Sequence, residues 1–257
     1  TQTTTAMPVP GRATFGGARP ETATVDSVPF HWAHDTARGE RRRSRTFADA
    51  ARRAINLLVA AVSVVLLAPV FLVVAALVKL SSPGPVIFAQ HRVGIDRRSR
   101  SRNVAGCRRG EDRGGRIFTI YKFRTMRVDS GRRQVWASKD DPRITPVGRF
   151  LRATRLDELP QLFNVLKGDM NIVGPRPEQP QIFQELSREV EGYRERQKVL
   201  PGITGLAQVS QGYDQSLDDV RMKVNLDLTY IQRRSPLKDV SIMARTMPVM
   251  VFQKVWE

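Results

Sequence analysis

Residues 54–78 read AINLLVAAVSVVLLAPVFLVVAALV and carry no charged side chain. At about 1.5 Å per residue, a helix of this length can cover the ~30 Å hydrocarbon core of a bilayer. No other part of the chain is apolar enough to surround such a helix on all sides within a soluble domain. The stretch therefore predicts a membrane helix.

The surroundings of this stretch favour a helix that enters the membrane, bends and returns to the same face. Both of its ends carry basic clusters, which the positive-inside rule places on the cytoplasmic side. A helix that spans the membrane has its ends on opposite sides and cannot meet this condition. The clusters comprise Arg41, Arg42, Arg43, Arg45, Arg52 and Arg53 before the stretch, and Lys79, Arg92, Arg97, Arg98, Arg100 and Arg102 after it. Pro69 lies near its middle, removes a backbone donor and predicts a sharp bend. The pattern alone leaves a kinked spanning helix as an alternative.

Composition divides the chain into three parts. Residues 1–45 are rich in Thr, Pro, Gly, Ala and Arg, lack an apolar period and predict a disordered tail without a signal peptide. Its two histidines, His31 and His34, have no cysteine or carboxylate cluster beside them that would complete a metal site. The membrane helix occupies residues 46–80, and the remaining domain residues 81–257. Within that domain, residues 96–116 form a basic stretch without periodicity, which predicts a loop.

The net charge of +17 requires an anionic partner or surface. Anionic lipid headgroups, phosphorylated substrates and nucleic acid all meet that requirement. Nucleic acid is disfavoured because the aromatic residues do not alternate with the arginines, as a base-stacking surface requires. A membrane-tethered nucleic-acid or lipid-binding module is the alternative of a different class. The single cysteine, Cys107, excludes an internal disulfide and fits a reducing, cytosolic location.

Periodicity predicts an α+β fold that is mainly α, with short strands. A short β-type run at Val86–Ala89 and the alternating segment RIFTIYKFRTM, residues 116–126, predict strands. Two later stripes predict helices with core-facing sides. These stripes are Phe183, Leu186, Val190 and Tyr193, and Val240, Met243, Met247 and Val251.

Residues 155–178, RLDELPQLFNVLKGDMNIVGPRPE, contain an adjacent pair of carboxylates, Asp157 and Glu158. Apolar residues follow the pair at helical spacing, which predicts a short amphipathic helix from about Asp157 to Gly168 with Pro160 in its first turn. Asp157 and Glu158 then lie at a helix N-terminus, where they could cap the helix or take part in chemistry. The local sequence alone favours capping.

The wider charge pattern favours chemistry. Basic side chains that can grip phosphate oxygens accompany the acidic pair. They are Lys122, Arg124, Arg149, Arg152, Arg155 and Arg176. Two carboxylates among such cations can serve as a nucleophile and as a ligand for Mg²⁺. The set suits phosphoryl transfer, in which a protein mainly positions groups and neutralises charge.

From the apolar stretch to the C-terminus, the chain resembles the bacterial sugar transferase family, the monotopic polyprenol-phosphate phosphoglycosyl transferases. The resemblance rests on several long motifs in the same order: SSPGPVIFAQHRVG, FTIYKFRTM, RATRLDELPQLFNVLKGDMNIVGPRPE, PGITGLAQVSQG and LDLTYIQRRSPLKDVSIMARTM. It implies transfer of a phosphosugar from a UDP-sugar to a polyprenol phosphate such as undecaprenyl phosphate. The products are a polyprenyl diphosphate sugar and UMP, in the first membrane step of surface glycan or exopolysaccharide assembly.

The resemblance also implies roles for individual residues. Asp157 matches the nucleophile that forms a covalent phosphosugar intermediate, and Glu158 matches the carboxylate that binds Mg²⁺. Direct displacement without a covalent intermediate is the alternative within the same family. Arg176, between Pro175 and Pro177, matches the motif that lines the phosphate and nucleotide side of the site. Further substrate-binding candidates are Lys122, Arg124 and Arg152.

Finally, the resemblance implies a re-entrant helix broken at the central proline, here Pro69. It places the protein at the bacterial cytoplasmic membrane, with residues 81–257 as the catalytic domain on the cytoplasmic face. Anionic headgroups are expected to contact the basic loop, nucleic acid is not an expected partner, and self-association stays open. Two positions depart from the family pattern: Ala68 stands where many relatives have serine, and Leu206 where they often have tryptophan.

Overall fold

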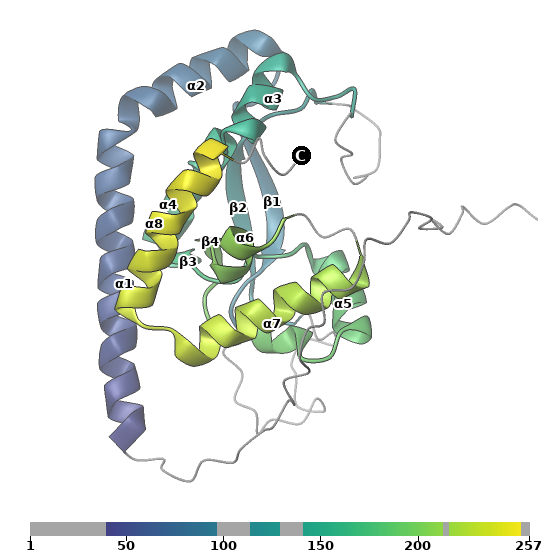
Figure 1. The fold of residues 1–257 in the computed structure, drawn as a ribbon. Helices are drawn as coiled ribbons and strands as arrows, with labels where there is room; N and C mark the ends of the chain where they lie inside the picture. Colours follow the sequence, from purple (N-terminus) through teal and green to yellow (C-terminus); the bar gives the residue numbers. More distant parts are fainter. Residues whose placement is uncertain (1–39, 97–113, 129–140, 213–215, 253–257) are drawn as a thin grey trace, which may run out of the picture. The chain divides into compact units, whose positions relative to one another are not determined.

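The computed structural model describes residues 40–96, 114–128, 141–212 and 216–252. The predicted tail, residues 1–45, falls almost wholly outside these residues, as does most of the basic loop, residues 96–116. The described part is mainly helical with four short strands, which confirms an α+β fold dominated by helices (Figure 1).

The apolar stretch forms two helices, α1 (Glu40–Leu66) and α2 (Ala68–Ser81). They meet at a 63° bend, so the predicted bend is confirmed. Pro69 lies in the first turn of α2, where its missing N–H leaves no hydrogen bond unmade. Within the described residues, no single helix has the length and apolar composition to cross a membrane. The bent pair Phe47–Leu66 and Ala68–Ser81 has sufficient length and apolar composition only when its two helices are taken together.

The strands form two small sheets. β1 (Ile87–Val93) and β2 (Ile117–Phe123) pair in antiparallel fashion, with Gln90 opposite Ile120. Both strands were predicted, although β1 continues past Ala89. β3 (Asn171–Val173) and β4 (Gly202–Thr204) pair in parallel.

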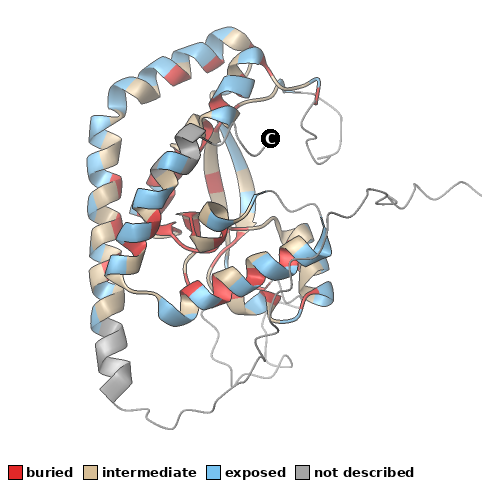
Figure 2. Cartoon of the chain, viewed as in Figure 1, coloured by how far each residue is buried: buried red, intermediate tan, exposed pale blue. Residues whose placement is uncertain are grey.

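The remaining elements surround the two sheets. They are α3 (Pro146–Ala153), the 3₁₀ turn η2 (Leu156–Glu158), α4 (Gln161–Lys167), α5 (Pro180–Glu189), the 3₁₀ helix η3 (Tyr193–Lys198), α6 (Leu206–Ser210), α7 (Leu217–Arg233) and α8 (Pro236–Phe252). The largest core cluster joins β2, α4, β3, α7 and α8 through buried side chains such as Ile120, Val165, Val173 and Ile242. Figure 2 shows buried segments on β2, β3, α7 and α8. Ala60 of α1 is part of the same cluster, so the first half of the apolar stretch packs on the domain.

One predicted helical stripe is shared by two elements. Phe183, Val190 and Tyr193 do lie in one buried cluster, as predicted. However, α5 ends at Glu189, and Gly192 with φ of 73° turns the chain into η3. Gly192 tolerates this left-handed conformation because it has no Cβ.

The other stripe is partly wrong. Ile242 is the buried apolar residue among the described side chains of α8, whereas Val240 is 50 % exposed. Met243 packs against the core beside Ile242, so the buried side of α8 is rotated away from Val240. The side chains of Met247 and Val251 lie outside the described set.

Candidate active site

The acidic pair does not begin the predicted helix. Asp157 and Glu158 belong to η2, while α4 starts at Gln161 with Pro160 as its N-cap residue. The predicted start at Asp157 is therefore wrong, and the end at Gly168 is confirmed by its φ of 88°. Pro160 stands at the N-cap of α4, where its missing N–H costs no intrahelical hydrogen bond.

Neither carboxylate caps a helix. The starts of η2 and α4 have no side-chain cap hydrogen bond. η2 is entered through Arg155, whose φ of 58° is rare for a residue with a Cβ. Such left-handed conformations persist where the surrounding structure enforces them, often at functional sites.

Glu158 lies at the centre of an ionic cluster. Its Oε1 accepts a hydrogen bond of 2.6 Å from Lys122 Nζ in β2 and another of 2.6 Å from Arg176 Nη2. Arg176 Nη1 is 3.3 Å from Oε2, so the guanidinium approaches both carboxylate oxygens. Three residues far apart in the sequence therefore meet at one point, as the charge pattern suggested.

Asp157 is held more loosely than its neighbour. Lys122 Nζ lies 3.8 Å from Asp157 Oδ2, close enough for an ion pair but beyond hydrogen-bond distance. Both carboxylates are 7 % exposed, so the difference between them comes from their partners and not from burial.

The two carboxyl groups are shifted in opposite directions. Burial raises the pKa of Asp157 above its ordinary value, and Lys122 opposes the shift only in part. Burial also acts to raise the pKa of Glu158, but Arg176 and Lys122 outweigh it and hold this pKa well below 4.5. Glu158 is thus fixed as an anion between two cations, while Asp157 keeps a more basic and less engaged oxygen. Adjacent carboxyls with divergent pKa values are typical of sites that divide two chemical roles.

Arg124 serves a different contact. Its Nη2 donates to the carbonyl of Ser82 at 2.6 Å and to Ser82 Oγ at 3.0 Å, which ties β2 to the end of α2. Arg152 lies in the last turn of α3. Among the described residues, no hydrogen bond or ion pair joins Arg124 or Arg152 to Asp157 or Glu158. Pro175 and Pro177 are buried on either side of Arg176.

A set of charged residues behind Arg176 was missed by the sequence reasoning. The set comprises Arg92, Glu178, Arg196, Lys223 and Asp227. Lys223 Nζ donates to Glu178 Oε1 at 2.9 Å, and Arg196 Nε donates to Asp227 Oδ2 at 2.8 Å. Asp227 could have been found, because it lies on the buried side of α7 with Val224 and Leu228.

The acidic pair fits Mg²⁺ held jointly with a phosphorylated substrate. Within the described residues, no three His, Cys, Asp or Glu side chains gather into a group that could enclose a metal. Mg²⁺ rarely needs such a cage, since it is usually bound by one or two carboxylates together with phosphate oxygens and water. Glu158, with Asp157 beside it, supplies donors of this kind.

Comparison with known proteins identifies the family. The model of the bacterial sugar transferase family matches residues 47–253, so the chain belongs to this family. It is 42 % identical over 197 residues to the UDP-N-acetylgalactosamine-undecaprenyl-phosphate N-acetylgalactosaminephosphotransferase of Aeromonas hydrophila, covering 76 % of this chain and 42 % of the relative. It is 41 % identical over 199 residues to the UDP-glucose:undecaprenyl-phosphate glucose-1-phosphate transferase of Escherichia coli (strain K12), covering 76 % and 39 %.

A relative of more similar length is the UDP-glucose:undecaprenyl-phosphate glucose-1-phosphate transferase of Caulobacter vibrioides (strain ATCC 19089 / CIP 103742 / CB 15). The two are 38 % identical over 207 residues, covering 79 % of this chain and 71 % of the relative. In contrast, the chain matches only 42 % and 39 % of the lengths of the Aeromonas and Escherichia proteins. The matching segment in all three includes most of the described residues.

Proposed function

We propose that the protein transfers a sugar 1-phosphate from a UDP-sugar to a polyprenol phosphate such as undecaprenyl phosphate and releases UMP. The observation that carries the proposal is the buried acidic pair, in which Glu158 is bound by Lys122 and Arg176 while Asp157 stays loosely held. The names of the relatives support the same substrates. The assembly of a surface glycan would begin with this step.

Asp157 is the nucleophile in this proposal. One of its carboxylate oxygens attacks the β-phosphorus of the UDP-sugar and forms an aspartyl phosphosugar, while the bond from that phosphorus to the bridging oxygen breaks and UMP leaves. An oxygen of the polyprenol phosphate then attacks the same phosphorus, and Asp157 leaves as a carboxylate. The raised pKa of Asp157 fits this role, because a more basic carboxylate is the better nucleophile once it is ionised.

Lys122 and Arg176 would neutralise the negative charge of the diphosphate and of the departing UMP. Lys122 and Arg176 can shift from Glu158 to the oxygens of the diphosphate, where charge-assisted hydrogen bonds are strongest. Glu158 is the residue that would hold Mg²⁺, with Asp157 adjacent. When bound there, Mg²⁺ supplies charge neutralisation for the diphosphate and its leaving group.

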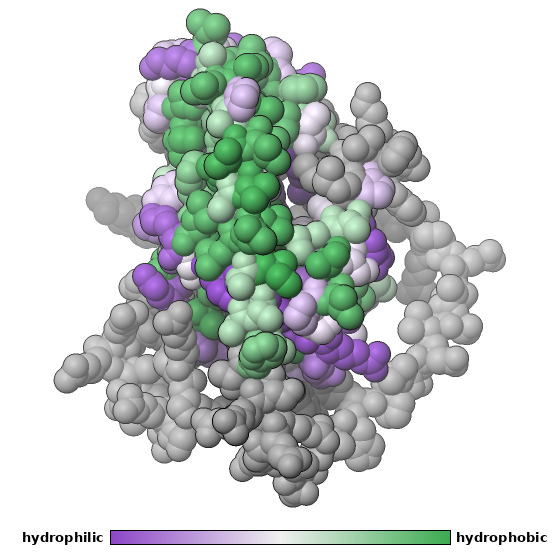
Figure 3. Space-filling model, turned by 90° about the vertical axis from the view of Figure 1, so that its left-hand side faces the viewer, coloured by the Kyte–Doolittle hydropathy of each residue, from purple (hydrophilic) through white to green (hydrophobic). Residues whose placement is uncertain are grey.

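The bent helix pair would place this site at the membrane surface. Large apolar side chains, each 59–84 % exposed, lie along both helices: Leu58, Val65, Leu66, Leu72, Val73 and Leu80. Figure 3 shows a continuous hydrophobic column on the side of the molecule that carries α1 and α2. An exposed apolar surface of this kind marks a membrane or partner contact. We infer a re-entrant helix pair that enters from the cytoplasmic face of the bacterial inner membrane.

The helix pair is also packed against the site. Phe71 of α2 lies 5.7 Å, centroid to centroid, from Phe123 at the end of β2 and from Phe163 in α4. β2 carries Lys122, and α4 follows the 3₁₀ turn that carries Asp157. The contacts would keep the site at headgroup height, where a soluble UDP-sugar and a lipid-linked phosphate both have access.

UMP release tests the proposed function. The purified protein in detergent or nanodiscs is incubated with undecaprenyl phosphate, Mg²⁺ and a panel of UDP-sugars. Release of UMP with at least one sugar, together with a lipid-linked diphosphate sugar, is expected. Absence of UMP with every sugar, from a protein that is folded by circular dichroism, would contradict the proposal.

Glu158→Gln tests the assigned magnesium ligand. The neutral amide binds Mg²⁺ more weakly, so half-maximal activity should need at least about tenfold more Mg²⁺ than in the wild type. Activity is measured as a function of Mg²⁺ at saturating UDP-sugar. An unchanged Mg²⁺ requirement would remove Glu158 from this role.

A further inference from the structure

The segment Pro175–Glu178 is held in place by hydrogen bonds from other parts of the chain. Pro175 and Pro177 have no backbone N–H, which halves the donors that the four residues could offer to one another. Yet each of the four carbonyls accepts a hydrogen bond from elsewhere in the chain. The outer two are bound by backbone amides, Gly202 N to Pro175 O and Val93 N to Glu178 O, each at 2.9 Å.

The two central carbonyls are bound by arginine side chains. Arg196 Nη2 donates to the carbonyl of Arg176 at 3.1 Å, and Arg92 Nη1 donates to the carbonyl of Pro177 at 3.0 Å. These two arginines come from η3 and β1, so they approach the segment from different elements. Together they form a cradle behind Arg176, and we use this name for Arg92 and Arg196.

The cradle is largely removed from solvent. The side chain of Arg196 is 0 % exposed and pairs with Asp227, and that of Arg92 is 16 % exposed and lies 3.9 Å from Glu178 Oε2. Arg92 Nη2 also donates to Gln90 Oε1 at 2.7 Å. Burying a guanidinium is unfavourable unless it is well paired, and its net gain in stability is often small. Stability alone therefore gives little reason to bury these arginines. Because each donates a hydrogen bond to one particular backbone carbonyl, we interpret them as fixing the position of that backbone.

We propose that Arg92 and Arg196 are positioning residues for Arg176. They fix the backbone of Arg176 from behind, so that its guanidinium extends to Glu158 at 2.6 Å and, in the reaction, to the diphosphate. Within the described residues, neither cradle residue forms a hydrogen bond or ion pair with Asp157 or Glu158. This inference rests on the proposed function, because its effect is on phosphosugar transfer.

Lysine substitutions test the cradle while keeping its charge. A lysine has one ammonium group and cannot reproduce the fixed fork by which Arg196 binds both Asp227 and the carbonyl of Arg176. Arg196→Lys and Arg92→Lys should each lower kcat/KM for the UDP-sugar by roughly tenfold, the scale of one hydrogen bond that involves a charged group. The affinity for undecaprenyl phosphate is measured separately and should stay unchanged.

A double-mutant cycle with Arg176→Ala separates positioning from general stability. If the cradle acts through Arg176, the lysine substitutions should change kcat/KM by less than about twofold once Arg176 is removed. Full additivity, with the same roughly tenfold loss in both backgrounds, would overturn the inference. Arg92→Lys keeps the test valid if Arg196→Lys does not fold, because Arg92 is less deeply buried.

Arg52→Lys is the matched control. Arg52 is also a buried arginine paired with an aspartate, Asp239, but it is not bonded to the Arg176 segment. Arg52→Lys should alter the melting temperature, but its effect on kcat/KM should be the same with and without Arg176→Ala. The wild type, assayed in parallel, tests the proposed function by itself: no UMP from the wild type overturns that function, whereas an active wild type with an additive cycle overturns only the cradle.

Discussion

Among the residues that the structure describes, two arginine–aspartate pairs have both side chains buried, and they lie in different regions. Arg52 of α1 pairs with Asp239 of α8, with side chains 4 % and 1 % exposed, and Arg196 of η3 pairs with Asp227 of α7, with side chains 0 % and 1 % exposed. Their chemistry and burial are nearly the same. Their remaining contacts are different, and those contacts indicate what each pair does.

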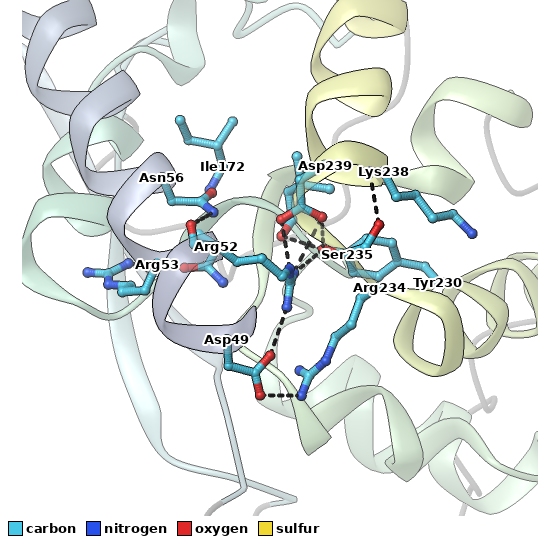
Figure 4. Close-up of polar contacts among 12 residues, drawn as sticks. Asp49, Arg52, Arg53, Asn56, Ile172, Tyr230, Arg234, Ser235, Lys238 and Asp239 are labelled. Carbon is cyan, nitrogen blue, oxygen red and sulfur yellow. Dashed lines mark hydrogen bonds and ion pairs between the residues drawn. The ribbon is translucent and has the colours of Figure 1, made fainter. Parts of the chain in front are cut away.

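The first pair attaches α1 to the rest of the domain (Figure 4). Arg52 Nη2 donates to Tyr230 Oη at 2.5 Å, and Tyr230 Oη lies 2.8 Å from Asp239 Oδ1. The next residues of α1 reinforce the joint: Arg53 Nη2 donates to the carbonyl of Val165 at 2.6 Å, and Asn56 Oδ1 accepts from Ile172 N at 2.6 Å. This polar turn of α1 contrasts with the exposed apolar side chains, such as Leu66 and Leu72, that lie farther along the bent pair.

The second pair supports the site itself. Arg196 donates from Nε to Asp227 and from Nη2 to the backbone carbonyl of Arg176. The side chain of Arg176 in turn donates to Glu158. The comparison teaches that burial of an ion pair does not by itself reveal its role. The contacts that each arginine makes besides its aspartate do reveal it: Arg52 binds Tyr230 of α7, whereas Arg196 binds the backbone of Arg176, whose side chain binds Glu158.

Breaking the Arg52–Asp239 pair should have the largest effect on stability. Arg52→Ala leaves the Asp239 carboxylate buried without its cation, which typically lowers the free energy of unfolding by ~3–5 kcal/mol. Denaturant unfolding in mild detergent, followed by far-UV circular dichroism, measures the change. A loss below ~1 kcal/mol would show that Asp239 gains access to water when α1 is released.

Replacing each pair by apolar residues should separate their roles. Buried ion pairs can often be exchanged for apolar residues of similar volume with a change in unfolding free energy within ~2 kcal/mol. We expect both Arg52→Met with Asp239→Leu and Arg196→Met with Asp227→Leu to fold. Only the second replacement should lower kcat/KM by about tenfold or more, because it removes the donor to the carbonyl of Arg176. Equal activities of the two double variants would contradict the distinction.

The stability of the protein at acid pH should reveal the contribution of Glu178, which pairs with Lys223 and lies near Arg196. Burial acts to raise the pKa of Glu178, but Lys223 and Arg196 outweigh it and lower the pKa to about 2. A depressed carboxyl pKa contributes stability above the ordinary value of 4.5, and this contribution is lost as the pH falls toward about 2. Glu178→Gln should thus destabilise the protein at neutral pH, and the difference from wild type should narrow between pH 4.5 and about 2. A difference that is constant over this range would show that the carboxylate is not favourably paired.

The smallest effect is expected at an exposed pair. Arg221 and Asp218 of α7 are 2.7 Å apart, but their side chains are 57 % and 85 % exposed. Solvent screens such a pair, so Arg221→Ala should change the free energy of unfolding by less than ~0.5 kcal/mol and leave UMP release unchanged. A larger loss would mean that exposure is a poor guide to the energetics of ion pairs in this chain.

The sequence predicted the features that are encoded by side-chain chemistry. The apolar stretch, the bend at Pro69, both strands of the β1–β2 sheet and the meeting of Lys122 with Glu158 and Arg176 were all predictable. The start of α4 was not, because the apolar spacing continued upstream of Pro160 while the backbone followed a separate 3₁₀ turn. Val240 was misplaced because a stripe of valine and methionine leaves the rotation of a helix ambiguous.

The cradle was hidden for a different reason. Arg92 and Arg196 bind backbone carbonyls, and every residue has a carbonyl, so the sequence does not indicate which one a given arginine will meet. Asp227 was more accessible to reasoning, since a carboxylate among the buried positions of α7 demands a buried cation. The clue was a polar residue in an apolar stripe, and its partner became evident only from the structure.

The nucleophile can be tested most directly by trapping the proposed intermediate on Asp157. Wild-type protein is incubated with Mg²⁺ and the active UDP-sugar in the absence of lipid acceptor, and UMP and intact protein mass are measured. We expect up to one equivalent of UMP and a mass increase equal to one phosphosugar, located by peptide mass spectrometry at Asp157. Asp157→Asn should fold and bind membranes but give neither product. Near-normal turnover by Asp157→Asn would contradict the account, and full wild-type turnover without any adduct would favour direct displacement.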